Sequence, residues 1–359
     1  MSNHSNVTIQ VCLVLHIDIC DKEVSVKVEH ALCHPTTTFC PDRGILTIAL
    51  PFTLLGKMKD KHKLKCAFKK ALLNSSFLYV SNFGNRNVQI YNISNPEVPV
   101  RIGEFNGENL NFPSGLTITD TTLYVVNPSL GNNTVEIYDI TNPTSPVHVG
   151  DFKSGNLHFP DQMAISGNLI YIANGLDNKI EIYNISTPTT PVRVGEFNGA
   201  NLDGPSGLIV TGTFLYVSNL NNNRIEIYDI LNPTNPVHVG HFNAGNFNQP
   251  AQFAITRDIL YVANFGDNML EIYNISNRKA PIRVGEFIGG NLNGPSVLAI
   301  TDNILYVSNL CDDTVQIYDI SNSIKPKHVG EFNGGNINTP NGMAIVKFHD
   351  LLRDNSKPI

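Results

Sequence analysis

Residues 215–229 read Leu-Tyr-Val-Ser-Asn-Leu-Asn-Asn-Asn-Arg-Ile-Glu-Ile-Tyr-Asp, and a version of this stretch recurs along most of the chain. The recurrence is easiest to follow by the tyrosine of the Leu-Tyr-Val core, which returns after 45, 47, 45, 45 and 45 residues. These tyrosines are Tyr79, Tyr124, Tyr171, Tyr216, Tyr261 and Tyr306. A fixed period of about 20 to 50 residues is the sequence sign of a repeat architecture, so this unit decides the fold.

Each copy of the repeat contains four short apolar segments separated by turns rich in Gly, Asn and Pro. In chain order they are of the types Pro-Ser-Gly-Leu, Leu-Tyr-Val, Ile-Tyr and Val-Gly-Phe, which we call strands a, b, c and d. Apolar and polar residues alternate within each segment, as is typical of β-strands. Four strands in about 45 residues indicate a propeller blade. A βαβ unit would need a helical pattern between strands, and no loop is long enough to hold one.

The order of the strands predicts how the ring closes. The repeat region begins on a b strand at 77–82 and ends on an a strand at 341–346. Pairing the last strand with the first blade completes six blades and covers two sheet edges that would otherwise be exposed. We therefore expect an all-β fold, in which a six-bladed β-propeller with four-stranded blades spans 77–348. Its C-terminal strand should close the first blade.

The repeat resembles two known repeat families. Pro-Ser-Gly-Leu at 205–208, followed by the stretch 215–229, resembles the NHL repeat. Ile-Ser-Asn-Pro-Glu-Val-Pro-Val-Arg-Ile-Gly at 93–103 looks like the bacterial LVIVD-type repeat. Both resemblances imply a propeller over about 77–348 and say little about function, because such repeats occur in scaffolds, receptors and a few lyases. Where the family usually has Asp after strand b, every copy here has Asn, which removes six carboxylates.

A second period of about 90 residues is superimposed on the first. The residue at one position of strand d alternates between Arg and His along the ring. The six residues are Arg101, His148, Arg193, His238, Arg283 and His328. The ring therefore reads as three copies of a two-blade unit. We expect these side chains to be structural, in contacts between neighbouring blades.

The segment before the propeller predicts a small β-rich domain over 1–56. Residues 7–20 and 23–33 alternate like the two strands of a hairpin, and 44–50 predicts a third strand. Five of the six cysteines of the chain lie before the repeats, with no Cys-x-x-Cys pair to indicate a zinc site. Both disulfide pairing and free thiols remain open for Cys12, Cys20, Cys33, Cys40 and Cys66, and Cys311 lies in the repeats.

A basic linker is expected over 57–76, with seven Lys between 57 and 70, and a short tail over 349–359. Residues 1–76 contain 10 of the 25 Lys and Arg and 6 of the 31 Asp and Glu, which leaves 15 against 25 for residues 77–359. An acidic propeller repels phosphate backbones, so we expect it not to bind nucleic acid.

The sequence leaves the cellular compartment open. Residues 1–20 lack the basic start and unbroken apolar run of a signal peptide, and no stretch is apolar enough for a membrane span. Two locations are consistent with this, the cytoplasm or a surface structure reached by a non-classical route.

Strand direction predicts where a ligand would bind. The b–c and d–a loops leave the blades on the same face, at the mouth of the central channel, and both sets are rich in Asn and Gly. Loops on a rigid scaffold commonly form binding sites, although Asn and Gly also suit turns with positive φ. The candidate ligand-binding residues are Asp161, Asp177, Asn219, Asn264, Asp267, Asn309, Asp312 and Asp313.

Two functions fit this pattern. The first is a non-enzymatic scaffold that binds a protein or glycan partner through the Asn-rich face, with no cofactor. The alternative is a divalent-metal-dependent hydrolase or lyase at the channel mouth, since six-bladed propellers include calcium-dependent lactonases. Asp161, which replaces a serine at the start of an a strand, would be its centre. No local motif marks a catalytic nucleophile, so the sequence favours the scaffold.

Overall fold

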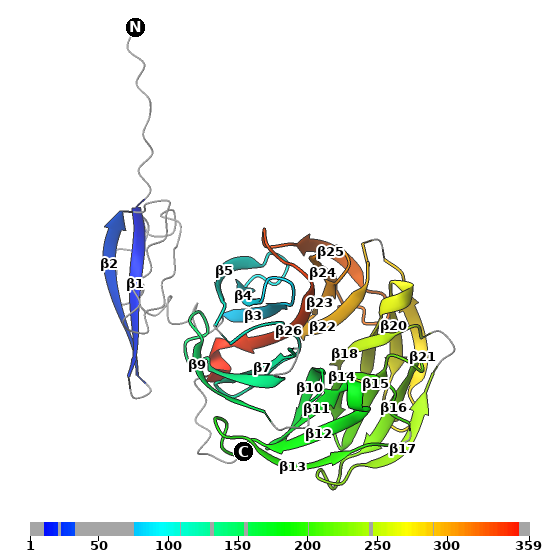
Figure 1. Cartoon of the computed structure of the whole chain (residues 1–359). Coiled ribbons are helices and arrows are strands. Elements are labelled where there is room, and N and C mark those ends of the chain that lie inside the picture. The colour runs from blue at the N-terminus through cyan, green and yellow to red at the C-terminus, as the bar shows by residue number, and fades with distance from the viewer. Residues whose placement is uncertain are drawn as a thin grey trace. The chain divides into compact units, whose positions relative to one another are not determined.

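The computed structural model describes residues 11–20, 23–32 and 75–351, apart from 108, 130–132, 154–156, 200, 244–246 and 290. In the repeat region, six four-stranded antiparallel sheets lie around a ring (Figure 1), which confirms the six-bladed propeller. Ser76–Val346 forms one compact unit. No helix among the described residues is long and apolar enough to cross a bilayer.

The blades share one strand order, from the channel outward. The innermost strands, from blade 1 to blade 6, are β26 (Pro340–Lys347), β6 (Leu116–Thr119), β10 (Pro160–Ser166), β14 (Pro205–Thr211), β18 (Pro250–Thr256) and β22 (Pro295–Thr301). The second strands are β3 (Ser76–Asn82), β7 (Thr122–Asn127), β11 (Leu169–Asn174), β15 (Phe214–Asn219), β19 (Ile259–Asn264) and β23 (Ile304–Asn309). The third strands are β4 (Asn87–Asn92), β8 (Thr134–Asp139), β12 (Lys179–Asn184), β16 (Arg224–Asp229), β20 (Met269–Asn274) and β24 (Thr314–Asp319). The outer strands are β5 (Val100–Phe105), β9 (Val147–Phe152), β13 (Val192–Phe197), β17 (Val237–Phe242), β21 (Ile282–Phe287) and β25 (Lys327–Phe332).

The first blade is closed as expected by the end of the repeat region. Its sheet has the order β26-β3-β4-β5, so the last strand of the chain pairs with the first strand of the propeller. A short helix, α2 (Phe348–Leu351), follows. This pairing covers the inner edge of β3, which would otherwise be exposed.

The N-terminal hairpin is present, with β1 (Val11–Cys20) and β2 (Glu23–Leu32) paired antiparallel. It belongs to a compact unit other than the propeller. The predicted third strand, the basic linker up to residue 74, Cys33, Cys40, Cys66 and the last eight residues lie outside the described residues, and Ser76 already belongs to β3. The boundaries proposed for these segments therefore stay predictions.

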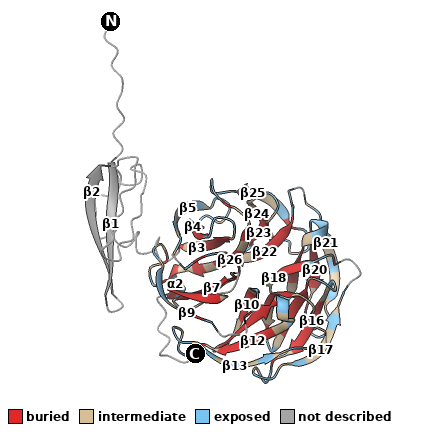
Figure 2. Ribbon diagram, viewed as in Figure 1, coloured by how far each residue is buried: buried red, intermediate tan, exposed pale blue. Residues whose placement is uncertain are grey.

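The core lies between the blades and is built from strands b and c, which Figure 2 shows as the most deeply buried. The repeat tyrosine of each blade is completely buried, and its hydroxyl donates a hydrogen bond to a carbonyl in the c–d turn of the next blade. Tyr171 in blade 3 donates to Pro233 at 2.8 Å, and Tyr306 in blade 6 donates to Pro96 in blade 1 at 2.6 Å. The other four bonds are Tyr79 to Pro143, Tyr124 to Pro188, Tyr216 to Arg278 and Tyr261 to Ser323. The ring is thus joined at all six junctions by the same bond.

The alternating Arg and His residues form most of their side-chain hydrogen bonds within their own blade, and His148 and His238 also contact Asn109 and Asn201 in loops that connect neighbouring blades. Each lies on strand d opposite the tyrosine of strand c, as Arg283 does opposite Tyr273. Arg283 bonds Glu271 at 2.5 Å, and His238 bonds Glu226 at 2.6 Å. Burial raises the pKa of Glu271, and the hydrogen bond from Arg283 opposes that shift. A buried carboxylate needs such a partner because an unpaired charge is costly in the interior.

A tyrosine-to-phenylalanine pair tests the bond between blades. Tyr171→Phe removes the hydroxyl and leaves the Pro233 carbonyl without its donor. The free energy of unfolding should therefore fall by about 1–2 kcal/mol. Tyr228→Phe is the matched control, because the buried Tyr228 hydroxyl has no hydrogen-bond partner and its loss should be neutral or stabilising. Urea unfolding of both variants measures the difference. Equal losses in the two would contradict a specific bond between blades.

Candidate functional site at the channel mouth

Six equivalent residues form a ring at the start of the innermost strands. They are Ser114, Asp161, Ser206, Ala251, Ser296 and Asn341. Asp161 is the ionisable member of this ring, and it lies in β10 directly after Pro160. Serine occupies alternate positions, whereas Asp161, Ala251 and Asn341 occupy the other three. The threefold pattern of the propeller therefore breaks at the channel.

Asp161 is held by both of its neighbours in the ring. The Ser206 hydroxyl donates a 2.5 Å hydrogen bond to Oδ2 of Asp161. The Asp161 main-chain oxygen accepts bonds from the Gly115 N–H at 3.0 Å and the Ser114 hydroxyl at 3.1 Å. The side chain is largely withdrawn from water but partly exposed. Burial raises the pKa of Asp161, and hydrogen bonds from Ser206 and Gln162 partly oppose the rise.

A glutamine layer lies one residue deeper in the channel. The Gln162 amide nitrogen donates to the Asn341 main-chain oxygen at 2.8 Å, and Gln252 donates to Oε1 of Gln162 at 3.3 Å. These residues come from blades 3, 1 and 5, so the bonds run across the channel. Both glutamines are at least 92% buried. Gly115 leaves room for the layer, because a Cβ there would lie 2.9 Å from Oε1 of Gln162. Asp161 is therefore reached from the loop face, above this layer.

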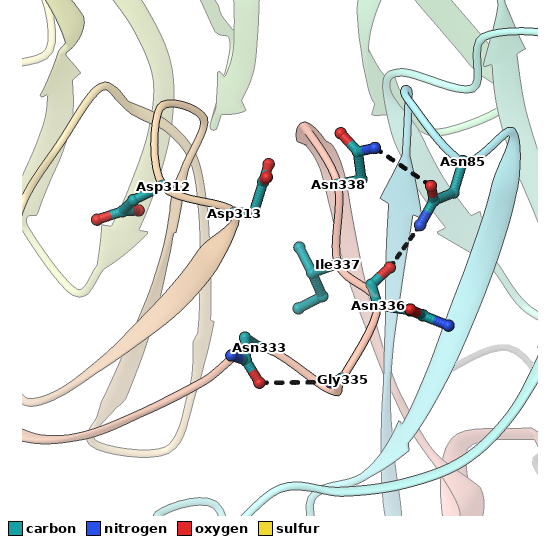
Figure 3. Close-up of a pocket in the computed structure, with 8 residues that line it drawn as sticks. All are labelled: Asn85, Asp312, Asp313, Asn333, Gly335, Asn336, Ile337 and Asn338. Carbon is teal, nitrogen blue, oxygen red and sulfur yellow. Dashed lines mark hydrogen bonds between the residues drawn. The ribbon is translucent and has the colours of Figure 1, made fainter.

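An open pocket of about 310 Å³ lies where blade 6 meets blade 1 (Figure 3). Asp312 and Asp313 line one side of it, and Asn85 and Asn338 lie across from them. The Asn338 side chain donates to Oδ1 of Asn85 at 3.2 Å. Oδ1 of Asp313 accepts the Thr339 N–H at 2.7 Å. The pocket offers amide and carboxylate groups to a polar ligand.

The structure places Asp177 and Asp267 at equivalent points in blades 3 and 5. Each ends a single 3₁₀ turn, η2 (Gly175–Asp177) or η3 (Phe265–Asp267), in the b–c loop. Oδ1 of Asp177 bonds His158 Nδ1 at 2.9 Å, and Oδ1 of Asp267 accepts the Asn248 amide at 3.0 Å. In both blades, the bond joins the b–c loop to the d–a loop.

Three predicted ligands, Asn219, Asn264 and Asn309, are fully buried at the ends of their b strands. Oδ1 of Asn219 accepts the Asp203 N–H at 3.1 Å, and Oδ1 of Asn264 accepts the Asn248 N–H at 2.7 Å. Asn309 donates to the Asn291 main-chain oxygen. These amides fasten the d–a loops to the blades, which explains why Asn is invariant across the repeat. Their predicted role as ligands stays a prediction.

Sequence reasoning missed several polar residues around Asp161, among them Ser206, Gln162, Gln252 and Asn341. Bonds such as that from Gln162 to Asn341 join residues 179 positions apart in the chain. The available signal was the departure of Gln162 and Gln252 from their equivalents Gly115, Gly207 and Gly342.

The donor set near Asp161 does not fit a resident divalent cation. Hard cations such as Ca²⁺ take six to eight oxygen ligands, usually with several carboxylates. The ring of innermost-strand residues supplies one carboxylate, and no group of three or more His, Cys, Asp or Glu in the described part of the chain could hold a metal. The residues near Asp161 are therefore suited to chemistry that uses side chains alone.

Comparisons with known proteins place these features in context. Residues 74–286 match the family described as "Lactonase, 7-bladed beta-propeller". No curated protein matches the sequence.

Solved structures share the fold at low sequence identity. A putative 6-phosphogluconolactonase of Bacteroides fragilis has a TM-score of 0.60 and 13% identity, over 76% of this chain and 98% of that one. The periplasmic gluconolactonase of Pseudomonas aeruginosa gives 0.57 and 14%, over 94% and 99%. A chain of a nidogen/laminin complex gives 0.58 and 16%, over 75% and 98%. At these identities the likeness shows the fold alone.

The raised pKa of Asp161 predicts a stability cost at neutral pH. The folded state holds the Asp161 proton more tightly than the unfolded state, so the cost is absent below the unfolded pKa of about 3.9. It grows as pH rises from the unfolded pKa to the folded pKa and is constant above the folded pKa. We expect Asp161→Asn to raise the melting temperature at about pH 7.5, with the gain vanishing near pH 3.

Asp177→Asn provides the control with the opposite sign. Burial alone would raise the pKa of Asp177, but the hydrogen bond and charge of His158, together with Lys179, hold it below its usual value. Its stabilising contribution is present above the unfolded pKa and is lost as pH falls through the folded pKa. This variant should melt lower than the wild type at about pH 7.5. A lower melting temperature for Asp161→Asn at that pH would contradict the assignment.

Proposed function

The chain belongs to the lactonase β-propeller family, with six blades where the family description has seven, and from this premise we propose that it hydrolyses a lactone at its channel mouth. The family match covers more than half of the chain, and lactonases are among the structures that share its fold. This supports the hydrolase alternative over the non-enzymatic scaffold that the sequence favoured.

The observation that carries the proposal is the environment of Asp161. A general base works best when its pKa lies near the working pH, and burial moves the pKa of Asp161 in that direction. Asp161 as a residue has intermediate exposure at the start of β10, and the Ser206 hydroxyl fixes the orientation of its carboxylate. A desolvated, oriented carboxylate at the mouth of a channel is suited to proton abstraction from water.

The proposed reaction is the addition of water to the lactone carbonyl. Asp161 takes a proton from the water as its oxygen bonds to the carbonyl carbon, and the ring C–O bond then breaks to give a hydroxy acid. Asn341, with Oδ1 accepting the Ser296 hydroxyl at 3.3 Å, is the side-chain amide that the ring offers to the carbonyl oxygen. Such donors stabilise the negative charge that develops on that oxygen.

The scaffold remains the second candidate because of the pocket between blades 6 and 1. Its amide and carboxylate groups are suited to the hydroxyl groups of a glycan or to the polar surface of a protein. Asn85→Ala and Asp312→Ala, at opposite sides of this pocket, should lower the affinity for such a partner while leaving lactone hydrolysis intact.

Asp161→Asn tests the hydrolase. Loss of a general base typically costs about 10²–10⁴-fold in rate, so kcat/KM for γ- and δ-lactones should fall by at least about 100-fold. Proton release in a pH-stat measures the hydrolysis. Because the substitution is nearly isosteric, the propeller should remain folded.

Asp229→Asn is the matched control, because Asn occupies the equivalent position in Asn92, Asn184 and Asn274. It removes one carboxylate at the c–d turn, where Asp229 accepts the Leu231 N–H at 2.9 Å, and should leave hydrolysis unchanged. Equal activity in Asp161→Asn and wild type would remove the proposed role of Asp161. Inactivity of the wild type toward a broad lactone panel would remove the function itself.

A further inference from the structure

The six loops that enter the innermost strands provide an internal comparison. Each ends in a tetrapeptide with proline at its third position. In blades 1, 2, 4, 5 and 6, these are Asn-Thr-Pro-Asn (338–341), Asn-Phe-Pro-Ser (111–114), Asp-Gly-Pro-Ser (203–206), Asn-Gln-Pro-Ala (248–251) and Asn-Gly-Pro-Ser (293–296). In blade 3, the tetrapeptide is His-Phe-Pro-Asp (158–161). Among the six tetrapeptides, blade 3 alone combines an imidazole, an aromatic ring and a channel carboxylate.

His158 replaces an amide that fastens the loop in other blades. Asn248 bonds Asp267 in blade 5, and Asn338 bonds Asn85 in blade 1. In blade 3, His158 makes the corresponding bond through Nδ1 to Asp177. Asn would satisfy this clamp, so the fold does not require an imidazole. The imidazole side chain is 57% exposed, and its second nitrogen, Nε2, lies on the other side of the ring from Asp177.

Phe159 and Asp161 are one and three residues after His158 in the chain. Phe159 is 48% exposed and has a φ of 55°. The equivalent residues Gln249 and Thr339 have a φ of 54°, so the fold requires this backbone conformation at the position. It does not require the exposed aromatic side chain of Phe159. Three residues span at most about 11 Å, so the Cα atoms of His158 and Asp161 lie within that distance of each other.

Resting on the proposed lactone hydrolysis, we propose that His158 is the general acid that protonates the leaving ring oxygen, with Asp177 as its positioning residue. Phe159 supplies an apolar surface for the carbon face of the substrate. The substrate class is a small lactone with an alkyl leaving oxygen, which needs a proton as the ring opens.

Asp161 and His158 together account for both proton transfers of the reaction. Asp161 gains a proton from water while the remaining hydroxide bonds to the carbonyl carbon. As the ring C–O bond breaks, its electron pair goes to the ring oxygen, which takes a proton from Nε2 of His158. Exchange with solvent returns the proton from Asp161 and restores the imidazolium. The net change is one water consumed and one hydroxy acid formed.

Few charged groups face the imidazole. Asp177 in η2 bonds it directly, and Lys179 of β12 lies 3.5 Å from the far oxygen of that carboxylate. Asn174 of β11 also donates to this oxygen, at 3.3 Å. Asp177 is therefore fixed by groups on two strands, and through it so is the direction of the His158 ring.

His158→Asn is the decisive variant, because it installs the clamp already present in blade 5. We expect kcat to fall about 100-fold on δ-valerolactone, with KM little changed, and the alkaline limb of the pH–rate profile to disappear. On dihydrocoumarin, whose phenolic leaving oxygen has a pKa near 10, the loss should be under about tenfold, because a phenolate leaves without a proton. A residue that merely holds the loop would affect both substrates equally.

Asn248→His is the matched control, because it creates the same imidazole–carboxylate pair in blade 5, beside Ala251 instead of a channel carboxylate. It should leave both rates unchanged. Equal losses of His158→Asn on the two lactones, or wild-type rates on both, would overturn the role of His158 while Asp161→Asn still reports on the hydrolase. A wild type inactive on both lactones would overturn the hydrolase and this role together.

Discussion

The hydrogen bond from each repeat tyrosine to the next blade is the constraint on which the ring depends. Neighbouring blades are separate sheets that pack together largely through apolar side chains, and apolar packing has little directional preference. A buried hydroxyl with one acceptor is directional, and it sets each blade against the c–d turn of the next. The same bond from Tyr306 to Pro96 joins the last blade to the first.

The fold was predictable because every copy of the repeat has the same four strand types in the same order. Strand number, blade count and closure by residues 341–346 all followed from the period and the order of strand types. The roles of individual polar residues were harder to predict. The sequence does not show that Asn219 accepts a hydrogen bond from the Asp203 N–H, because that contact depends on the path of the d–a loop. Likewise, Arg193 could contact either blade until its bond to Glu181 at 2.7 Å was seen.

The candidate site was predictable in its centre and not in its surroundings. Asp161 differs from the serine at equivalent positions, so the sequence alone identified it. Its partners come from other blades, and their approach depends on the diameter and twist of the ring. Gln162 has room to reach Asn341 because residue 115 is glycine, and a Cβ there would lie 2.9 Å from Oε1 of Gln162. A one-dimensional pattern contains no measure of that space.

The strand that closes the ring also supplies Asn341 to the channel. During synthesis, β3 emerges first and β26 last, with more than 250 residues between them, so the first blade waits for nearly the whole propeller to be made. Contacts over such sequence separations form slowly, and the unpaired inner edge of β3 is exposed to other chains in the meantime. The ring and its channel would be completed in one late event. Partly made chains that lack β26 would then lack both closure of the first blade and the Asn341 side of the channel.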